Sequence, residues 1–193
     1  ILRAQKIYAD FEDSEKLGGT YGMLGNTYKS KGDTKSSIKY YSMAKSIFLK
    51  EKMYFNYAQS LIIQSEVYLL VNDNDNAWKN LNESLTYAKS FNIPMMNGKI
   101  KFSMAQAHYN NSDWSDALDC IEDSIDVFQD LNNKLMLSRS YAIKTDILIQ
   151  KEKISSAEKS LEKLKKYSRR LNIESLDEKI VTLENKIKQS RIQ

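Results

Sequence analysis

Histidine and cysteine, two residue types common in metal sites and in nucleophilic catalysis, each occur once in this sequence, at His108 and Cys120. A structural zinc site needs about four His, Cys or carboxylate ligands at short spacings, and the sequence has no cluster of His and Cys. A catalytic thiol needs an adjacent base, and none is evident near Cys120. We therefore predict a packing role for His108, an unreactive thiol at Cys120, and no catalytic residue, cofactor or metal ligand.

Four of the six glycines fall between Gly18 and Gly25, and such a glycine-rich stretch could form a phosphate-binding loop. This stretch matches neither the dinucleotide nor the nucleoside triphosphate fingerprint, and no strand precedes it. Gly19, Gly22 and Gly25 are three residues apart, which places them on one face of a helix. Each glycine costs a helix about 1 kcal/mol relative to Ala. Close approach of a neighbouring helix or of a ligand would offset this cost, and helix packing is the favoured explanation.

Charge is divided between two runs. Seven acidic residues and no basic residue lie between Asp113 and Asp130, whereas eight basic residues and three glutamates lie between Lys151 and Arg170. The acidic run is interpreted as a solvated helix face. Three of its residues precede three lysines by 40 positions, so we predict that the two sets neutralise each other: Asp119, Asp123 and Asp126 with Lys159, Lys163 and Lys166. With a net charge of only +4, this argues against direct nucleic-acid contact.

A repeat of 40 residues predicts the elements that position these residues. Small residues recur at Ser37, Ala77, Ala117 and Ala157, and again seven positions later at Ala44, Ser84 and Ser124. Each repeat carries two stripes of apolar residues at helical spacing, and the single proline and the absence of strand-type alternation predict an all-α chain. The predicted organisation is one array over 1–193. It consists of the second helix of a truncated repeat at 1–13, repeats at 14–51, 53–91, 94–131 and 134–171, and a capping helix at 173–193. The missing initiator Met predicts a piece of a longer protein.

The first full repeat resembles the tetratricopeptide repeat (TPR) family. The segment from Met23 to Asp33 reads MLGNTYKSKGD and is followed by Ser37, Tyr41 and Ala44, which is close to the family motif. The resemblance covers essentially the whole chain. A period of 40 instead of 34 is similar to the repeats of kinesin light chains, of G-protein-regulating scaffolds and of bacterial regulators that sense short peptides. The resemblance implies an all-α, right-handed α-solenoid of antiparallel helix pairs.

The resemblance also implies a binding site, because the first helices of TPR pairs line a concave groove. The non-core positions of these helices begin with Gly19 and Gly22. They continue with Asn26, Lys29, Gln59, Ile62, Glu66, Leu69, Lys99, Phe102, Gln106, Tyr109, Arg139 and Asp146. The polar members would bond the backbone of an extended peptide, and the apolar members would hold its side chains. The carboxylate clamp of chaperone-binding members is not reproduced, since Gly22, Ile63 and Ser103 replace its Lys, Asn and Arg.

These features together predict a non-enzymatic scaffold module that binds a protein or peptide segment in the groove. No apolar run approaches the roughly 18 residues of a membrane span, and one cysteine fits a reducing compartment, so a cytoplasmic location is expected. Whether the chain forms a homodimer is left open. The alternative is the sensory, ligand-binding region of a bacterial transcriptional or signalling regulator whose output domain lies outside this sequence.

Overall fold

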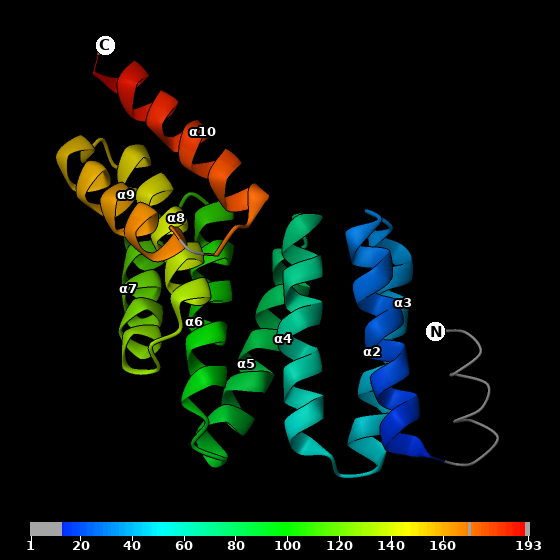
Figure 1. The fold of residues 1–193 in the computed structure, drawn as a ribbon. Coiled ribbons are helices and arrows are strands. Elements are labelled where there is room, and N and C mark those ends of the chain that lie inside the picture. Colours follow the sequence, from blue (N-terminus) through cyan, green and yellow to red (C-terminus); the bar gives the residue numbers. More distant parts are fainter. Residues whose placement is uncertain (1–12, 170, 192–193) are drawn as a thin grey trace. The chain divides into compact units, whose positions relative to one another are not determined.

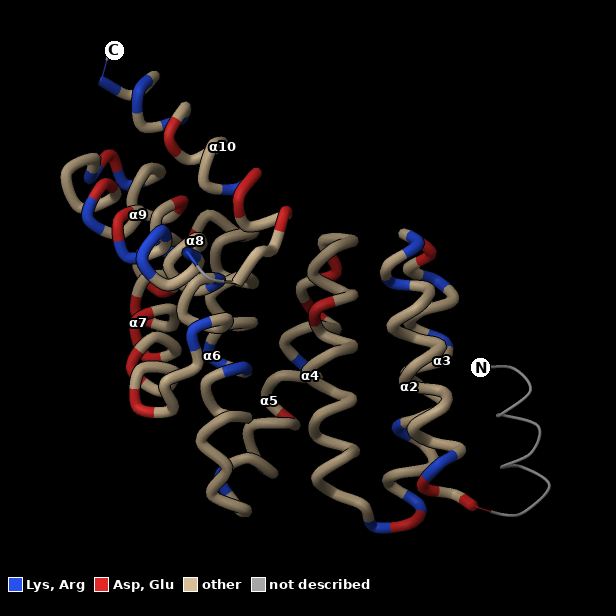
Figure 2. The backbone as a smooth tube through the Cα atoms, viewed as in Figure 1, with Lys and Arg blue, Asp and Glu red and all other residues tan. Residues whose placement is uncertain are grey.

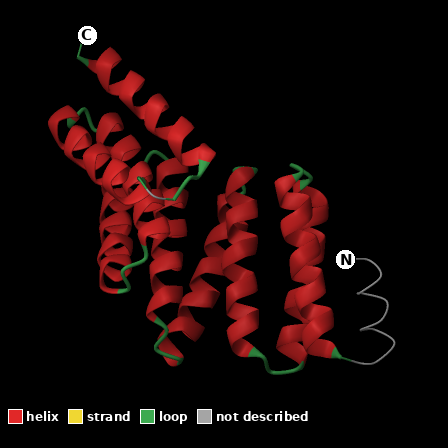
Figure 3. Ribbon diagram, in the orientation of Figure 1, coloured by secondary structure: helices red, strands yellow, loops and turns green. Residues whose placement is uncertain are grey.

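The computed structural model describes residues 13–169 and 171–191 (Figure 1). The predicted helix of a truncated repeat, at 1–13, lies outside this part except for Asp13. Figure 3 shows that all regular structure in the described residues is helical, which confirms the all-α prediction. The helices are α2 (Ser14–Ser30), α3 (Thr34–Lys50), α4 (Tyr54–Leu70), α5 (Asn74–Ser90), α6 (Pro94–Asn110), α7 (Trp114–Asp130), α8 (Lys134–Gln150), α9 (Ile154–Ser168) and α10 (Glu174–Ser190).

The turns between helices share one backbone device. The second residue after each helix from α2 to α8 has a positive φ: Gly32, Lys52, Asn72, Asn92, Ser112, Asn132 and Glu152. The next N–H then bonds back to the last turn of the helix, as Asp33 does to Tyr28 (3.0 Å) and Asp73 to Tyr68 (2.9 Å). This is the Schellman arrangement, which ends a helix and reverses the chain in three residues.

Several turns also supply the acceptor that begins the next helix. Asp33 accepts from the Ser36 N–H at 3.0 Å, and Asp73 accepts from the Asn76 N–H at 3.2 Å. Such side-chain caps satisfy backbone donors that would otherwise lack a partner. Lys153, at the corresponding position before α9, makes no side-chain cap. Asp113, before α7, makes no side-chain cap either.

The chain divides after Ile93 into two compact units. In the first unit, α2 pairs with α3 and α4 with α5, while α3 also packs on α4. In the second unit, α6 pairs with α7 and α8 with α9, α7 packs on α8, and α10 lies against both α8 and α9. The recurring small residues lie at these contacts: Ser37, Ala77, Ala117 and Ala157 are fully buried.

Two glycines allow the first helix of a pair to approach the second. A Cβ on Gly25 would come within 2.9 Å of the Tyr41 ring, and one on Gly98 within 2.9 Å of the Phe128 ring. A buried serine of the partner helix bonds each glycine carbonyl: Ser37 donates to Gly25 at 2.9 Å, and Ser124 donates to Gly98 at 3.0 Å. The packing explanation therefore holds for Gly25.

The predicted pairing of the acidic and basic runs is wrong. Figure 2 shows acidic residues along α7, but among the described residues no ion pair joins Asp119, Asp123 or Asp126 to a lysine of α9. Asp123 pairs with Lys101 of α6 at 2.7 Å instead. Both α7 and α9 pack on α8, and α8 supplies Lys144 to Glu122 of α7 at 2.7 Å. Side chains of the intervening helix therefore meet the acidic run first.

Candidate ligand-binding faces

The predicted groove residues all lie on the first helices of the pairs. Asn26, Lys29, Gln59, Ile62, Glu66 and Leu69 lie on α2 and α4 of the first unit, and Lys99, Phe102, Gln106, Tyr109, Arg139 and Asp146 on α6 and α8 of the second. We name the two surfaces the α2–α4 face and the α6–α8 face.

An ion pair joins the two helices of the α2–α4 face. Lys29 Nζ lies 2.5 Å from Glu66 Oε2, and both side chains are partly exposed, at 26% and 35%. An exposed pair of this kind contributes only about 0–1 kcal/mol to stability. A charged group of a ligand could therefore replace either Lys29 or Glu66 in this pair at little cost in stability.

Asn26 lies beside this pair and is exposed. Its Oδ1 accepts a hydrogen bond from the Tyr41 hydroxyl at 2.7 Å. Burial raises the pKa of Tyr41 well above its usual value, so the hydroxyl stays protonated and keeps donating. Because the amide oxygen is occupied within the fold, the Nδ2 group is the part of Asn26 with which a ligand carbonyl could bond.

The glycines of α2 divide into two kinds. Gly18 and Gly25 lie under the rings of Phe48 and Tyr41, whereas a Cβ added to Gly19 or Gly22 would have no neighbouring atom of the described residues within 4 Å. Packing by the described residues therefore does not offset the helix cost of Gly19 and Gly22. They form a smooth strip that continues the exposed line of Asn26, and a ligand backbone could approach it closely.

Two apolar members of the predicted groove are core residues in the structure. Ile62 is only 1% exposed and Leu69 only 7%. Neither offers a surface for ligand side chains in this conformation, which departs from the role predicted for them. Gln59 is half-buried and remains within reach of a ligand.

The α6–α8 face keeps its aromatic residues partly accessible. Phe102 is half-buried and packs against both apolar clusters of its unit. Tyr109 is also half-buried, with its ring edge-on to Trp114 at a centroid distance of 5.1 Å. Burial is the main cause that raises the Tyr109 pKa. These rings therefore serve the core and the surface together. The polar members around them are half-buried Lys99 and Gln106 and exposed Arg139.

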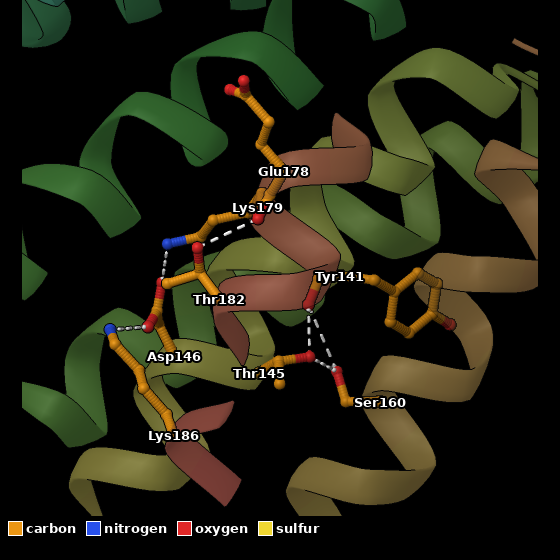
Figure 4. Close-up of polar contacts among 8 residues, drawn as sticks. All are labelled: Tyr141, Thr145, Asp146, Ser160, Glu178, Lys179, Thr182 and Lys186. Carbon is orange, nitrogen blue, oxygen red and sulfur yellow. Dashed lines mark hydrogen bonds and ion pairs between the residues drawn. The ribbon is translucent and has the colours of Figure 1, made fainter. Parts of the chain in front are cut away.

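The remaining predicted residue, Asp146, is covered by α10. Its side chain is only 8% exposed and lies between two lysines of that helix, Lys179 and Lys186 (Figure 4). The Lys186 Nζ is 2.7 Å from Asp146 Oδ1, and Lys179 pairs with Oδ2. The predicted capping helix thus occupies this end of the α6–α8 face. Sequence reasoning missed the contact, although lysines seven residues apart share one helix face.

Further contacts hold α10 against its unit. Leu176, Leu183 and Ile187 are buried, while Glu184 pairs with Lys165 of α9 at 2.6 Å and Arg191 pairs with Glu158. Next to the Asp146 site, Thr145 donates to the backbone oxygen of Tyr141 at 2.7 Å (Figure 4). Asp146 therefore belongs to a helix–helix contact and is not open to a ligand while α10 is docked.

The side chains with possible chemistry are not assembled into a reactive site. His108 is half-buried, with Nδ1 3.6 Å from Asp113 Oδ2. Cys120 is a free, half-buried thiol whose pKa is raised, chiefly by burial. In residues 13–169 and 171–191, no group of three or more His, Cys, Asp or Glu side chains is placed to hold a metal ion. Within the same residues, no helix has the length and apolar character to cross a membrane.

Comparison with known proteins supports the fold. No family model matches the chain, and no curated protein matches it. Among solved structures, aspartyl phosphate phosphatase F from Bacillus subtilis is similar with a TM-score of 0.77 and 18% identity, over 93% of this chain and 48% of that chain. A Rap protein in complex with Competence and Sporulation Factor gives a TM-score of 0.73 at 18% identity, over 89% and 47%.

A putative kinesin light chain from Podosopora anserina, described as having nearly identical TPR-like repeats, gives a TM-score of 0.65 at 12% identity, over 90% of this chain and 97% of that chain. These likenesses show that the chain has a TPR-like solenoid fold. The chain spans about half the length of the phosphatase and of the Rap protein.

Proposed function

We propose that this chain is a non-enzymatic module that binds a protein or peptide segment on the first helices of its pairs. The α2–α4 face is the main surface, and the observation that carries the proposal is the open strip at Gly19 and Gly22. Glycine weakens a helix unless something approaches it closely, and no described residue does. A ligand backbone on this strip would explain why the glycines are there.

Neighbouring side chains suit an extended peptide. Asn26 Nδ2 can donate to a backbone carbonyl, and Gln59 can donate and accept. Lys29 and Glu66 offer one charge of each sign at the rim. Extended segments are generally held in this way, by polar groups for the backbone and by pockets for alternate side chains.

On the α6–α8 face, Phe102 and Tyr109 are the proposed anchors, with Lys99, Gln106 and Arg139 as polar contacts. Aromatic and Arg residues carry a large share of interface energy. The named likenesses fit a binding role: one is a Rap protein complexed with Competence and Sporulation Factor, and another is the TPR2AB domain of yeast Sti1 with a pHSP90 partner, at a TM-score of 0.55. A cytoplasmic location and the absence of nucleic-acid contact remain predictions from the sequence.

The test is selection of peptides from a random display library against the chain, followed by titration of an enriched peptide by fluorescence anisotropy. Gly22→Arg fills the open strip without touching the core, and it should weaken binding by about tenfold or more, which corresponds to about 1.4 kcal/mol. The control is Asp116→Asn/Asp126→Asn on exposed positions of α7, which should bind as the unaltered chain does. An enriched peptide that loses affinity in the control but not with Gly22→Arg would contradict the assignment.

The alternative is that this module is the sensory region of a longer regulator. The observation in its favour is that the chain covers about half of the Rap protein that was solved with Competence and Sporulation Factor. The two functions differ in output, because a scaffold brings partners together whereas a regulator changes state. Ligand-dependent change in the activity of an output domain in the longer native protein would favour the regulator, and its absence would favour the scaffold.

A further inference from the structure

A cavity of about 410 Å³ lies between α7, α8 and α9 of the second unit, and none of its lining residues belongs to the α6–α8 face. Leu118, Tyr141 and Leu148 form its apolar part. Ser156 and Ser160 add hydroxyl groups, and four lysines contribute the charge: Lys144, Lys153, Lys159 and Lys163. The only acidic residue in the lining is Glu122, and Lys144 already pairs with it at 2.7 Å.

The other three lysines make no ion pair within the described part of the chain. They lie along α9 and at its start over ten residues, which corresponds to about 15 Å of helix. Lys159 and Lys163 are one turn apart, and like charges at this spacing destabilise a helix. The cluster therefore costs stability, and a bound anion would remove that cost.

In the first unit, a side chain closes the corresponding junction of three helices, α3, α4 and α5. Gln64 occupies the position 80 residues before Lys144, or two periods earlier, and is only 1% exposed. Its Nε2 donates to Ser42 of α3 at 2.8 Å, and its Oε1 accepts from Asn80 of α5 at 3.0 Å. One amide thus bridges both neighbouring helices. In the second unit, Lys144 reaches only toward α7, and the space beside α9 stays open.

The charge of the residues at this junction also differs between the two units. Asp73 and Glu83 of the first unit correspond to Lys153 and Lys163 of the second, so two acidic positions have become basic. Lys79 and Lys159 correspond and keep their charge. The second unit thus combines an unfilled junction with a basic lining, and both differences lie at the cavity.

We propose that this cavity binds a small molecule that carries a polyphosphate group together with an apolar or aromatic part. Several ammonium groups in a row suit a chain of phosphates, because each charge-assisted hydrogen bond is about twice as strong as a neutral one. Half-buried Leu118 would contact the apolar part, while the buried side chains of Tyr141 and Leu148 form the floor beneath it. A cavity of this volume lies within the usual range of small-molecule sites, roughly 300–1,000 Å³.

The experiment is calorimetric titration of the chain with tripolyphosphate and with adenosine triphosphate at about 150 mM salt, where long-range attraction is screened. Both probes should bind, and adenosine triphosphate should bind more tightly because its base adds apolar contact. Lys159→Gln/Lys163→Gln should weaken both by about tenfold or more. The matched control, Lys166→Gln/Arg169→Gln, removes the same charge from exposed positions near the end of α9 and should change affinity by less than about twofold.

A second variant tests the cavity independently of the three lysines. Lys144→Gln/Ser160→Asn introduces the bridge seen in the first unit and should close the junction, so that binding is lost while Lys153, Lys159 and Lys163 remain. Its helical content by circular dichroism should match the unaltered chain. The proposal is overturned if neither probe binds, if the control weakens binding as much as Lys159→Gln/Lys163→Gln, or if the folded bridge variant binds as before. Equal affinity for both probes would overturn the apolar part of the site.

Discussion

The ring of Tyr41 covers Gly25 so closely that a Cβ at this glycine would lie 2.9 Å from the ring. The tyrosine cannot move freely, because its hydroxyl also donates to Asn26 at 2.7 Å. One side chain of α3 thus sets both how near α2 lies and how the exposed amide of the α2–α4 face is oriented.

Gly25→Ala should destabilise the protein. Overpacking typically costs about 1–3 kcal/mol, while the better helix propensity of Ala returns about 1 kcal/mol. We therefore expect a net loss of up to about 2 kcal/mol in the free energy of unfolding, measured by urea denaturation. Increased stability would show that α2 and α3 are not in this close contact.

Gly19→Ala and Gly22→Ala should have the opposite effect, because no described atom lies within 4 Å of either Cβ position. Each substitution should raise the free energy of unfolding by up to about 1 kcal/mol, through helix propensity and a less flexible unfolded chain. The same urea titration checks this, with Gly25→Ala as the matched comparison. A loss of stability at either position would mean that the strip is packed.

The docking of α10 should depend on the lysines around Asp146. Lys179→Met/Lys186→Met leaves a buried carboxylate without a partner, and breaking a buried pair in this way costs about 3–5 kcal/mol. If α10 undocks, water reaches the Asp146 carboxylate, so the measured loss of stability is smaller than this figure. Hydrogen exchange should show rapid exchange in α10 with α8 and α9 still protected. Asp146→Asn, which leaves only the partly exposed lysines unpaired, should have a smaller effect, and equal protection of α10 in all three proteins would contradict this account.

Docking of α10 should also weaken at alkaline pH. The hydrogen bond to Asp146 is the main cause that raises the pKa of Lys186 above its usual value. A raised pKa means that the stabilisation is complete below the unfolded lysine pKa of about 10.4 and is lost as the pH rises through the folded value. The difference in melting temperature between the unaltered chain and Lys186→Met should therefore shrink above about pH 10.4. A difference that stays constant across this range would reject the linkage.

Periodicity predicts the helices and turns well, since small residues such as Ala77 and Ala117 and turn residues such as Asn72 and Asn132 each meet a local backbone or packing requirement. Long polar side chains are less predictable, because their partners depend on which helix lies between them. The 40-residue spacing pairs Lys159 with Asp119, but α8 lies against both helices. The contact of Lys186 with Asp146 has the same 40-residue spacing, but it forms because α10 packs directly on α8.

Burial on a helix face is also only partly predictable. Ile62 and Leu69 share helical spacing with Glu66 on α4, and spacing alone does not distinguish an open groove from a packed surface. The spacing places the glycines at 19, 22 and 25 on one helix, but of these three only Gly25 lies against a ring of α3, so the predicted single face is not reproduced. Their different surroundings depend on the positions of Tyr41 and the other α3 side chains, which the spacing does not specify.

The central claim is that a ligand backbone lies on the strip of the α2–α4 face. The most direct measurement is the affinity of a selected peptide for the Gly19→Ala/Gly22→Ala protein, taken together with its melting temperature. Two methyl groups at a close backbone contact should weaken binding by about tenfold, or about 1.4 kcal/mol, while the protein becomes more stable. A more stable protein that binds the peptide with unchanged affinity would contradict the claim.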